Sequence, residues 1–395
     1  MSLNATPSAN RARIGIFGRR NAGKSSLINA LTGQDLAVVS ETKGTTTDPV
    51  KKAMELLPLG PVVLVDTPGL DDEGELGKKR MEKALEELRR TDIALLVVDA
   101  KEGLAPEDRA LLDRIRNLEI PYLVVFNKCD EQDCSAPEDL AGASACVSAS
   151  NGRGIEALKE RIAHLTPGDS GRRLIADLLQ PGDLVVLVVP IDKSAPKGRL
   201  ILPQQQTIRD VLEAGALSLT VRETELPAAL AALKEKPRMV VTDSQAFASV
   251  ARDTPEDVPL TSFSILMARY KGYLDAALRS IPAVESLEDG DTVLIAEGCT
   301  HHRQCEDIGT VKIPKWLRAH SGKDFRIETC SGPSFPEDLT PYKLVIHCGG
   351  CMLNEREVLY RMHEAERQGV PFINYGLLIA YMQGILERAT RVFHA

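Results

Sequence analysis

The fold expected for the first third of this chain follows from the sequence Gly18-Arg19-Arg20-Asn21-Ala22-Gly23-Lys24-Ser25. A short apolar run, residues 13–17, precedes it and predicts a buried β-strand. Apolar residues then return at helical spacing as far as Leu31. A loop of the form G-x-x-x-x-G-K-S between a strand and a helix cradles phosphates with its backbone N–H groups. The segment therefore predicts an α/β domain that binds a nucleotide.

The residue types in this loop have defined tasks at a bound nucleotide. Lys24 is expected to reach the β- and γ-phosphates, and Ser25 is expected to give its hydroxyl to Mg²⁺. We expect nucleotide contacts from these residues of the loop: Gly18, Asn21, Ala22, Gly23, Lys24, Ser25 and Ser26.

Two further segments extend the phosphate and magnesium site. Asp66-Thr67-Pro68-Gly69 follows the apolar run 62–65. We expect Asp66 to hold the Mg²⁺ shell and the Gly69 N–H to meet the γ-phosphate. Gly44-Thr45-Thr46-Thr47-Asp48 lies between these elements, where a switch loop supplies a threonine, Thr46, to Mg²⁺.

The base is indicated by Asn127-Lys128-Cys129-Asp130, which follows the apolar run 122–126. A carboxylate in the place of Asp130 accepts hydrogen bonds from the N1–H and 2-amino groups of guanine, which adenine cannot offer. Ser148-Ala149, after a further short strand, is expected to support the edge of the base. The segments in this order and spacing predict GTP, GDP and Mg²⁺ as ligands.

This region resembles the GTPases of the Era and MnmE type, with their GTT switch loop, DTPG and NKxD segments. Leu70 stands where Ras-like GTPases have a water-orienting glutamine. Asn21 occupies the loop position that, in the MnmE-like group, goes with a K⁺ ion replacing an arginine finger. The resemblance implies slow, K⁺-stimulated hydrolysis with these catalytic residues: Lys24, Asn21, Thr46 and Gly69.

A second site is predicted in the last third. Gly298-Cys299-Thr300-His301-His302 follows the apolar run 292–296, and His347-Cys348-Gly349-Gly350-Cys351 follows the apolar run 343–346. Both half-sites would lie at the carboxyl ends of parallel strands, where open α/β sheets bind ligands. Thiolates suit an iron–sulfur cluster or zinc better than Ca²⁺ or Mg²⁺.

We expect Cys299, Cys348 and Cys351 to be metal ligands. His301 or His347 would either supply a fourth ligand or support the thiolates by hydrogen bonding.

Composition limits the classes of partner. The 395 residues are 43% hydrophobic and 26% charged, with a formal net charge of −8, which argues against a broad nucleic-acid surface. Residues 1–13 lack the apolar core of a signal peptide, and no apolar run approaches the ~18 residues of a membrane-spanning helix. We expect a cytoplasmic protein that binds neither nucleic acid nor membrane.

Three α/β domains are expected. Residues 1–168 form the P-loop GTPase domain, a doubly wound parallel sheet that ends before a segment rich in turn-forming residues. Residues 169–262 alternate short β and α segments and are expected to be an assembly module. Residues 263–395 carry the thiols on a further parallel sheet, with single helices expected at 264–279 and 377–388.

GTPase segments followed by C-x-H, a spacer and H-C-x-x-C resemble the [FeFe]-hydrogenase maturation GTPase family. The resemblance extends through the middle region, including Pro196-Lys197-Gly198-Arg199-Leu200. It implies a homodimer formed by the middle domain, and a [4Fe–4S] cluster on Cys299, Cys348 and Cys351 with an exchangeable fourth iron position. It also implies a scaffold that carries the di-iron subcluster precursor to apo [FeFe]-hydrogenase, with two radical-SAM maturases as further partners.

Two alternatives remain open on the residues alone. One is a zinc-containing GTPase associated with RNA or ribosomes, with a Cys₃His site made of Cys299, His301, Cys348 and Cys351. The other is a thiol redox enzyme that uses Cys348 and Cys351.

Overall fold

The computed structural model describes residues 11–33, 50–69, 74–130, 137–165, 171–191, 200–298, 307–332 and 334–393. The chain divides into two compact units, Met1–Ser170 and Gly171–Ala395. No helix of the described ranges has the length and apolar character needed to cross a membrane.

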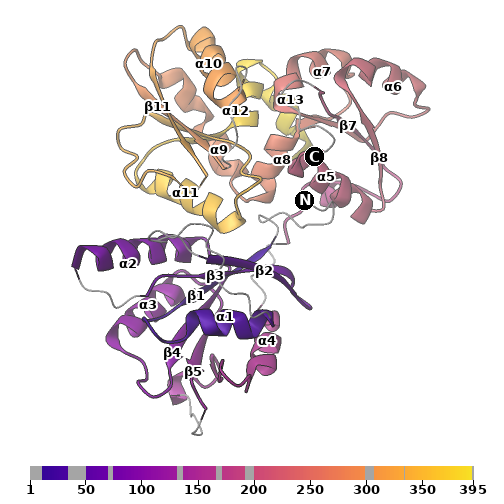
Figure 1. The fold of residues 1–395 in the computed structure, drawn as a ribbon. Helices are drawn as coiled ribbons and strands as arrows, with labels where there is room; N and C mark the ends of the chain where they lie inside the picture. Colours follow the sequence, from indigo (N-terminus) through magenta and orange to yellow (C-terminus); the bar gives the residue numbers. More distant parts are fainter. Residues whose placement is uncertain are drawn as a thin grey trace. The chain divides into compact units, whose positions relative to one another are not determined.

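The first unit is built on a six-stranded sheet in the order β2-β3-β1-β4-β5-β6 (Figure 1). Its strands are β1 (Ala12–Phe17), β2 (Val50–Leu56), β3 (Gly60–Asp66), β4 (Ile93–Asp99), β5 (Tyr122–Asn127) and β6 (Ser144–Cys146). Its helices are α1 (Lys24–Thr32), α2 (Gly74–Arg89), α3 (Pro106–Asn117) and α4 (Ile155–His164). The expected doubly wound parallel sheet of a P-loop GTPase is confirmed, and its edge strand β2 runs antiparallel to β3.

Helices cover both faces of this sheet, as a doubly wound fold requires. One face packs on α1 and α4 through residues such as Leu27 and Leu158, and the other packs on α2 and α3 through residues such as Leu88 and Leu112. The strands are apolar on both sides because both sides are buried. This arrangement leaves the carboxyl ends of β1, β3, β4 and β5 free to carry the loops of the nucleotide site.

The second unit contains two four-stranded parallel sheets of the same strand order, β8-β7-β9-β10 and β12-β11-β13-β14. The first has β7 (Leu184–Val188), β8 (Leu217–Val221), β9 (Met239–Thr242) and β10 (Leu260–Ser262), with α5 (Leu202–Glu213), α6 (Leu226–Ala232), α7 (Phe247–Asp253) and α8 (Phe263–Tyr270). The second has β11 (Thr292–Glu297), β12 (Arg326–Ser331), β13 (Leu344–His347) and β14 (Phe372–Asn374), with α9 (Leu274–Ser280), α10 (Ile313–Ser321), α11 (Glu355–Arg367), α12 (Tyr375–Met382) and α13 (Leu386–Thr390).

The two sheets share apolar packing. One continuous cluster of buried side chains runs from Val186 and Val240 in the first sheet to Ile295 and Ile346 in the second. The expected boundary between residues 262 and 263 therefore falls inside a single compact unit, at the junction of β10 and α8.

Two expected helices are each broken into two. The segment 264–279 forms α8 and α9, separated by Lys271-Gly272-Tyr273, where Gly272 has φ +80°. The segment 377–388 is divided between α12 and α13, with Gly384 at φ +70°. Apolar spacing continues across both breaks, so periodicity alone did not reveal them, whereas a left-handed glycine ends a helix.

Among the described strands, β8 pairs only with β7 and therefore lies at an edge of its sheet. Leu217 on this strand and Leu212 on the preceding helix are each 58% exposed. An edge strand with exposed apolar side chains is a surface that pairs with another chain unless it is covered.

Candidate functional site

The phosphate loop joins β1 to α1 in a conformation that few residue types adopt. Gly18, Asn21 and Gly23 have φ of 141°, 61° and 92°. A Cβ on Gly23 would lie 2.2 Å from Asn127 Nδ2, so only glycine fits between the loop and β5. Asn127 Nδ2 donates to the carbonyl of Ala22 at 3.0 Å, which connects the loop to the segment expected to bind guanine.

The Lys24 ammonium turns back over the loop that precedes it. It donates to the carbonyl oxygens of Gly18 and Arg19, both at 2.8 Å, and the residue is 8% exposed. An ammonium held over a ring of backbone N–H groups is the arrangement that binds the β- and γ-phosphates of a nucleotide.

Ser25 and Asp66 form the predicted magnesium pair. Ser25 Oγ donates to Asp66 Oδ2 at 2.6 Å, and Asp66 Oδ1 is buried without a hydrogen-bond partner among the described residues. Burial raises the pKa of Asp66, while Ser25 and Lys24 oppose this rise. An orphaned carboxylate oxygen beside a hydroxyl fits a hard cation such as Mg²⁺. Gly69 lies against the phosphate loop, since a Cβ there would be 3.0 Å from the Arg20 nitrogen.

The guanine end is assembled from the loops after β5 and β6. Asp130 is exposed and accepts hydrogen bonds from Ser148 Oγ and from Ser150 Oγ, the latter at 2.7 Å. These two hydroxyls lower the pKa of Asp130 and keep it an acceptor. The Ala149 N–H donates to Asn127 Oδ1 at 3.0 Å, so this segment also holds the asparagine. Sequence reasoning missed Ser150, which follows the predicted Ser148-Ala149 pair by one residue.

The thiol segments follow two neighbouring strands, as predicted. Strands β11 and β13 pair in parallel with Ala296 opposite His347. Their boundary is where the strand order of this sheet reverses, and open α/β folds bind ligands in that crevice. Strand β13 ends at His347 and Cys348 follows it directly, while β11 ends at Glu297, next to Gly298.

The Cys348 sulfur is a hydrogen-bond acceptor. The N–H groups of Gly298 and Gly350 point at Sγ, at 3.0 and 3.4 Å. Burial raises the pKa of this thiol, and the two N–H groups act in the opposite direction. Backbone N–H groups directed at a sulfur stabilise a thiolate and tune a cluster bound to it. Burial likewise raises the pKa of Cys351, to about 11.

His347 uses both ring nitrogens within the fold. Nδ1 lies 2.7 Å from the Cys348 carbonyl oxygen, and Nε2 lies 3.4 Å from an Arg361 terminal nitrogen. A guanidinium only donates, so Nε2 accepts and the proton sits on Nδ1. Burial and then Arg361 lower the pKa of His347 to about 3, so the ring is neutral.

Arg361 is a buried residue behind the C-x-x-C turn that the sequence analysis did not predict. It is fully buried on α11, pairs with Glu357 at 2.8 Å, and donates to the Gly332 carbonyl at 2.6 Å. The signal was present, because Glu357 and Arg361 stand four residues apart on the stripe that also carries Val358 and Met362. A charged pair within an apolar stripe indicates a buried ion pair.

The break between α8 and α9 supplies two more unpredicted contacts. Tyr273 is fully buried, and its hydroxyl donates to the Cys348 carbonyl at 3.2 Å while accepting from Asn374 at 3.0 Å. Lys271 is 3% exposed and donates to the Leu353 carbonyl at 2.9 Å. The break thus places a hydroxyl and an ammonium against the backbone of the C-x-x-C turn.

Several predicted residues lie outside the described ranges. They are Thr46 with its switch loop, Leu70, residues 196–199 of the Pro196–Leu200 segment, Cys299 and His301. Within the described ranges, no group of three or more His, Cys, Asp or Glu side chains could hold a metal ion. Of the three cysteines predicted to bind a cluster, Cys348 and Cys351 lie within the described ranges and Cys299 lies outside them.

Comparisons with known proteins match three parts of the chain. Residues 174–272 match the hydrogen maturase F dimerization domain, and residues 275–392 match the hydrogen maturase F tetramerization domain. Residues 13–128 match a 50S ribosome-binding GTPase model, so the first unit is a GTPase domain. The two maturase models together cover more than half of the chain, and their descriptions indicate that it forms oligomers.

Curated relatives of this chain include tRNA modification GTPases that match about two fifths of its length. The tRNA modification GTPase MnmE of Chloroflexus aurantiacus is 38% identical over 162 residues, 39% of this chain and 34% of that protein. MnmE of Xanthomonas oryzae pv. oryzae is 40% identical over 155 residues, again 39% and 34%. This chain thus spans about a third of the length of these relatives. Among solved structures, Aquifex aeolicus Era bound to GDP.AlF4- is 20% identical over 53% of this chain and 93% of that one, with a TM-score of 0.33.

Proposed function

Because this chain belongs to the hydrogen maturase F family, we propose that it is a GTP-hydrolysing iron–sulfur scaffold. It holds a [4Fe–4S] cluster on Cys299, Cys348 and Cys351, and it carries a di-iron subcluster precursor as cargo to apo [FeFe]-hydrogenase. Two radical-SAM maturases are its further partners, and it acts in the cytoplasm. The main support for the proposal comes from the contacts made by the sulfur and the carbonyl group of Cys348.

Cys348 is suited to a metal-bound thiolate in three respects. It lies at the point where the strand order of its sheet reverses. Its sulfur accepts two backbone N–H groups. Its carbonyl is fixed by the His347 ring and the Tyr273 hydroxyl, so the C-x-x-C turn is held before any cluster arrives. When bound, the cluster supplies an iron position that can exchange ligands, which a carrier needs in order to release cargo.

We assign His347 a supporting role. An imidazole binds iron through a nitrogen lone pair, and the only lone pair of neutral His347 faces Arg361. Ligation would leave the buried guanidinium with one fewer acceptor, at a cost of about 1–3 kcal/mol. The fourth position would therefore go to His301 or to an external group.

At the other site, we propose that GTP is hydrolysed with Mg²⁺ held by Ser25, Asp66 and Thr46. The Ser25–Asp66 pair and the orphaned Asp66 oxygen support the cation, and Asp130 supports guanine. Lys24, Gly69 and Asn21 would stabilise the transferring phosphoryl group, with K⁺ beside Asn21. Hydrolysis would gate the association of partners and leave the cluster chemistry unchanged.

The two alternatives receive less support. A reactive dithiol needs thiols with a lowered pKa, whereas burial raises the pKa of Cys348 and Cys351. A closed Cys₃His zinc site would depend on His301, because His347 has no free lone pair.

The homodimer is proposed to form along β8. Among the described strands, β8 lies at an edge of its sheet and carries the exposed Leu217. The helix that precedes it in the chain, α5, carries the exposed Leu212. Pairing two such edges would bury these side chains and satisfy the unpaired backbone groups of both strands.

Anaerobic reconstitution tests the scaffold proposal. The full chain is purified under argon, supplied with iron and sulfide, desalted, and analysed for metals and by electron paramagnetic resonance after reduction. We expect about four irons per chain and a reduced-cluster signal. Stoichiometric zinc without iron would favour the zinc GTPase, and a metal-free dithiol would favour the redox enzyme.

A further inference from the structure

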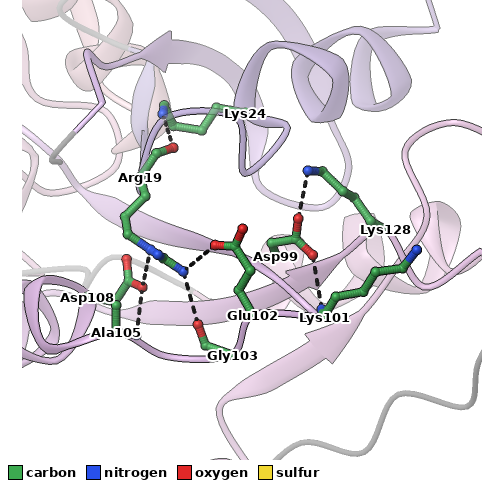
Figure 2. A network of polar contacts seen from close by, with 9 residues as sticks. All are labelled: Arg19, Lys24, Asp99, Lys101, Glu102, Gly103, Ala105, Asp108 and Lys128. Atoms are coloured by element: carbon green, nitrogen blue, oxygen red, sulfur yellow. Dashed lines mark hydrogen bonds and ion pairs between the residues drawn. The ribbon is translucent and has the colours of Figure 1, made fainter. Parts of the chain in front are cut away.

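Arg19 is the second residue of the phosphate loop, and its side chain leaves the loop for the segment after β4 (Figure 2). Nε lies 3.2 Å from Asp108 Oδ2, and a terminal nitrogen lies 2.9 Å from Glu102 Oε2 and 3.3 Å from the Gly103 carbonyl. All three partners belong to residues 99–108, which we call the brace segment. The Arg19 side chain is 20% exposed, so solvent screens these contacts only in part.

The carboxylate that receives Arg19 is buried in the fold. The Asp108 side chain is 1% exposed, and its Oδ2 accepts from Arg19 and from the Ala105 N–H at 3.1 Å. Its other oxygen has no hydrogen-bond partner in the part of the chain that the structure describes. A buried carboxylate with so few donors requires the guanidinium that faces it. Removal of either partner therefore loosens the start of α3 as well as the loop.

The other end of the brace segment reaches the guanine side. Lys128 Nζ binds Asp99 Oδ2 at 2.7 Å, and the Lys101 N–H donates to Asp99 Oδ1 at 3.0 Å (Figure 2). The N–H groups of Glu102 and Gly103 both donate to the Asp99 carbonyl, at 3.1 and 2.9 Å, which makes the turn compact. Lys128 itself has φ +67°, a conformation that a non-glycine residue keeps only where its surroundings hold it.

We propose that Arg19 is a positioning residue whose side chain ties the phosphate loop, through residues 99–108, to Lys128 in the guanine-binding segment. The two ends of the nucleotide site then hold GDP or GTP as one unit. Lys24 faces the phosphates and donates to carbonyl oxygens within the loop, whereas the Arg19 guanidinium makes its contacts outside the loop and can keep them with or without a nucleotide. Arg19 is thus suited to keep the loop in place both in the empty site and in the site that holds a nucleotide.

The inference rests on the nucleotide-binding part of the proposed function, and a double-mutant cycle tests it. The release rate of a fluorescent GDP analogue is measured by stopped flow on the full chain with Mg²⁺, for wild type, Arg19→Gln, Asp99→Asn and the double variant. We expect Arg19→Gln to speed release about ten-fold, the effect of one lost charge-assisted hydrogen bond. Because Arg19 and Asp99 act through one segment, the double variant should release GDP no faster than about two-fold above the faster single variant.

Purely local roles predict a different result. Independent sites would make the release rate of the double variant the product of the two single effects, and that outcome overturns the proposal. Arg19→Lys should restore part of the slow release, because an ammonium can reach one acceptor but cannot bridge three. Arg116→Gln is the matched control, an arginine of the same unit that donates to Tyr122 at 3.0 Å, and it should release GDP as wild type does.

Two further outcomes keep the tests separate. If wild type retains no GDP, the proposed nucleotide function fails; if it binds GDP and Arg19→Gln releases it at the wild-type rate, only the present inference fails. Should Arg19→Gln unfold, Glu102→Gln removes a single contact at a side chain that is 61% exposed. We expect that variant to speed release about three-fold, and no change would contradict the brace.

Discussion

The nucleotide site and the thiol site both lie at the carboxyl ends of parallel strands, yet they are held in place by different means. At the nucleotide site, the groups expected to bind the ligand are backbone N–H groups of a loop with left-handed residues and the tips of side chains such as Ser25 and Asp130. At the thiol site, the C-x-x-C turn is held from behind by buried side chains, namely His347, Arg361 and Tyr273.

This difference indicates how each site should fail. A site built from backbone geometry loses function when one charged tip is removed, while the fold remains. A site supported by a buried polar network couples its ligand set to the stability of the unit, because an unpaired buried group is costly.

The largest effect is expected for Cys348→Ser. Loss of this thiolate should abolish cluster assembly in anaerobic reconstitution, measured as iron content and as the signal of the reduced cluster. GTP turnover should stay within about two-fold of wild type, because the two sites belong to separate compact units, each with its own core. Cys330→Ser is the matched control, since Cys330 is a free thiol on β12 of the same sheet. A cluster retained by Cys348→Ser would remove this residue from the ligand set.

Lys24→Ala should give the reverse pattern. Loss of the ammonium over the phosphates should lower GTP turnover about 100-fold, comparable with the loss of one charge-stabilising donor in other enzymes. Cluster content should be unchanged. Lys159→Ala is the control, because its ammonium pairs with Glu156 at 2.7 Å on α4 and should leave turnover at the wild-type rate. A loss of cluster in Lys24→Ala would show that the two sites depend on each other.

The same contrast explains how much of each site could be predicted from the sequence. The residues of the phosphate loop, Asp66 and Asn127 were predicted because backbone geometry requires fixed residue types at fixed spacings, and the structure brings them together. The partners of the loop in the brace segment were missed, since Asp99 at the end of β4 and Asp108 in the first turn of α3 are ordinary carboxylates in the sequence. Pairing across 89 residues, as between Arg19 and Asp108, has no local signal.

At the thiol site, the sequence predicted the strand ends but not what supports them. The apolar runs before Gly298 and Cys348 placed β11 and β13, and the pairing of these strands brings the Gly298 N–H within 3.0 Å of the Cys348 sulfur. Tyr273 and Lys271 were assigned to the middle of one helix, and only the break at Gly272 brings them to the turn. The expected roles of Cys299 and His301 stay predictions, because these residues lie outside the described ranges.

The buried network predicts a pH effect on stability. The pKa of His347 is lowered from 6.5 to about 3 in the fold, so the folded state binds fewer protons than the unfolded chain. Stability from this group is therefore complete above the unfolded pKa, declines as pH falls through 6.5, and continues to decline to about 3. Between pH 7.5 and 5 the loss should be about 2 kcal/mol of unfolding free energy.

Urea unfolding of the metal-free full chain at these two pH values measures the effect, with His347→Asn as the comparison. Asparagine does not titrate, so the variant should be less stable at neutral pH and should lose about 2 kcal/mol less than wild type on acidification. Equal losses in both proteins would show that His347 is not held neutral by the fold, and would remove the basis for its supporting role.

The smallest effect concerns K⁺ and the conformation of Asn21. The side chain is exposed, and its backbone is left-handed at φ +61°, a region that asparagine tolerates better than most residues. Asparagine is therefore suited to this position for two reasons, its backbone and its amide oxygen, and only the second involves a cation.

We expect wild type to hydrolyse GTP about ten-fold faster in K⁺ than in Na⁺, a difference of ~1.4 kcal/mol in the barrier. Asn21→Gly keeps the left-handed backbone and removes the oxygen, so it should hydrolyse GTP at one rate in both salts. Equal rates for wild type would leave backbone conformation as the sole reason for asparagine here, and stimulation that survives in Asn21→Gly would place the cation on other groups of the loop.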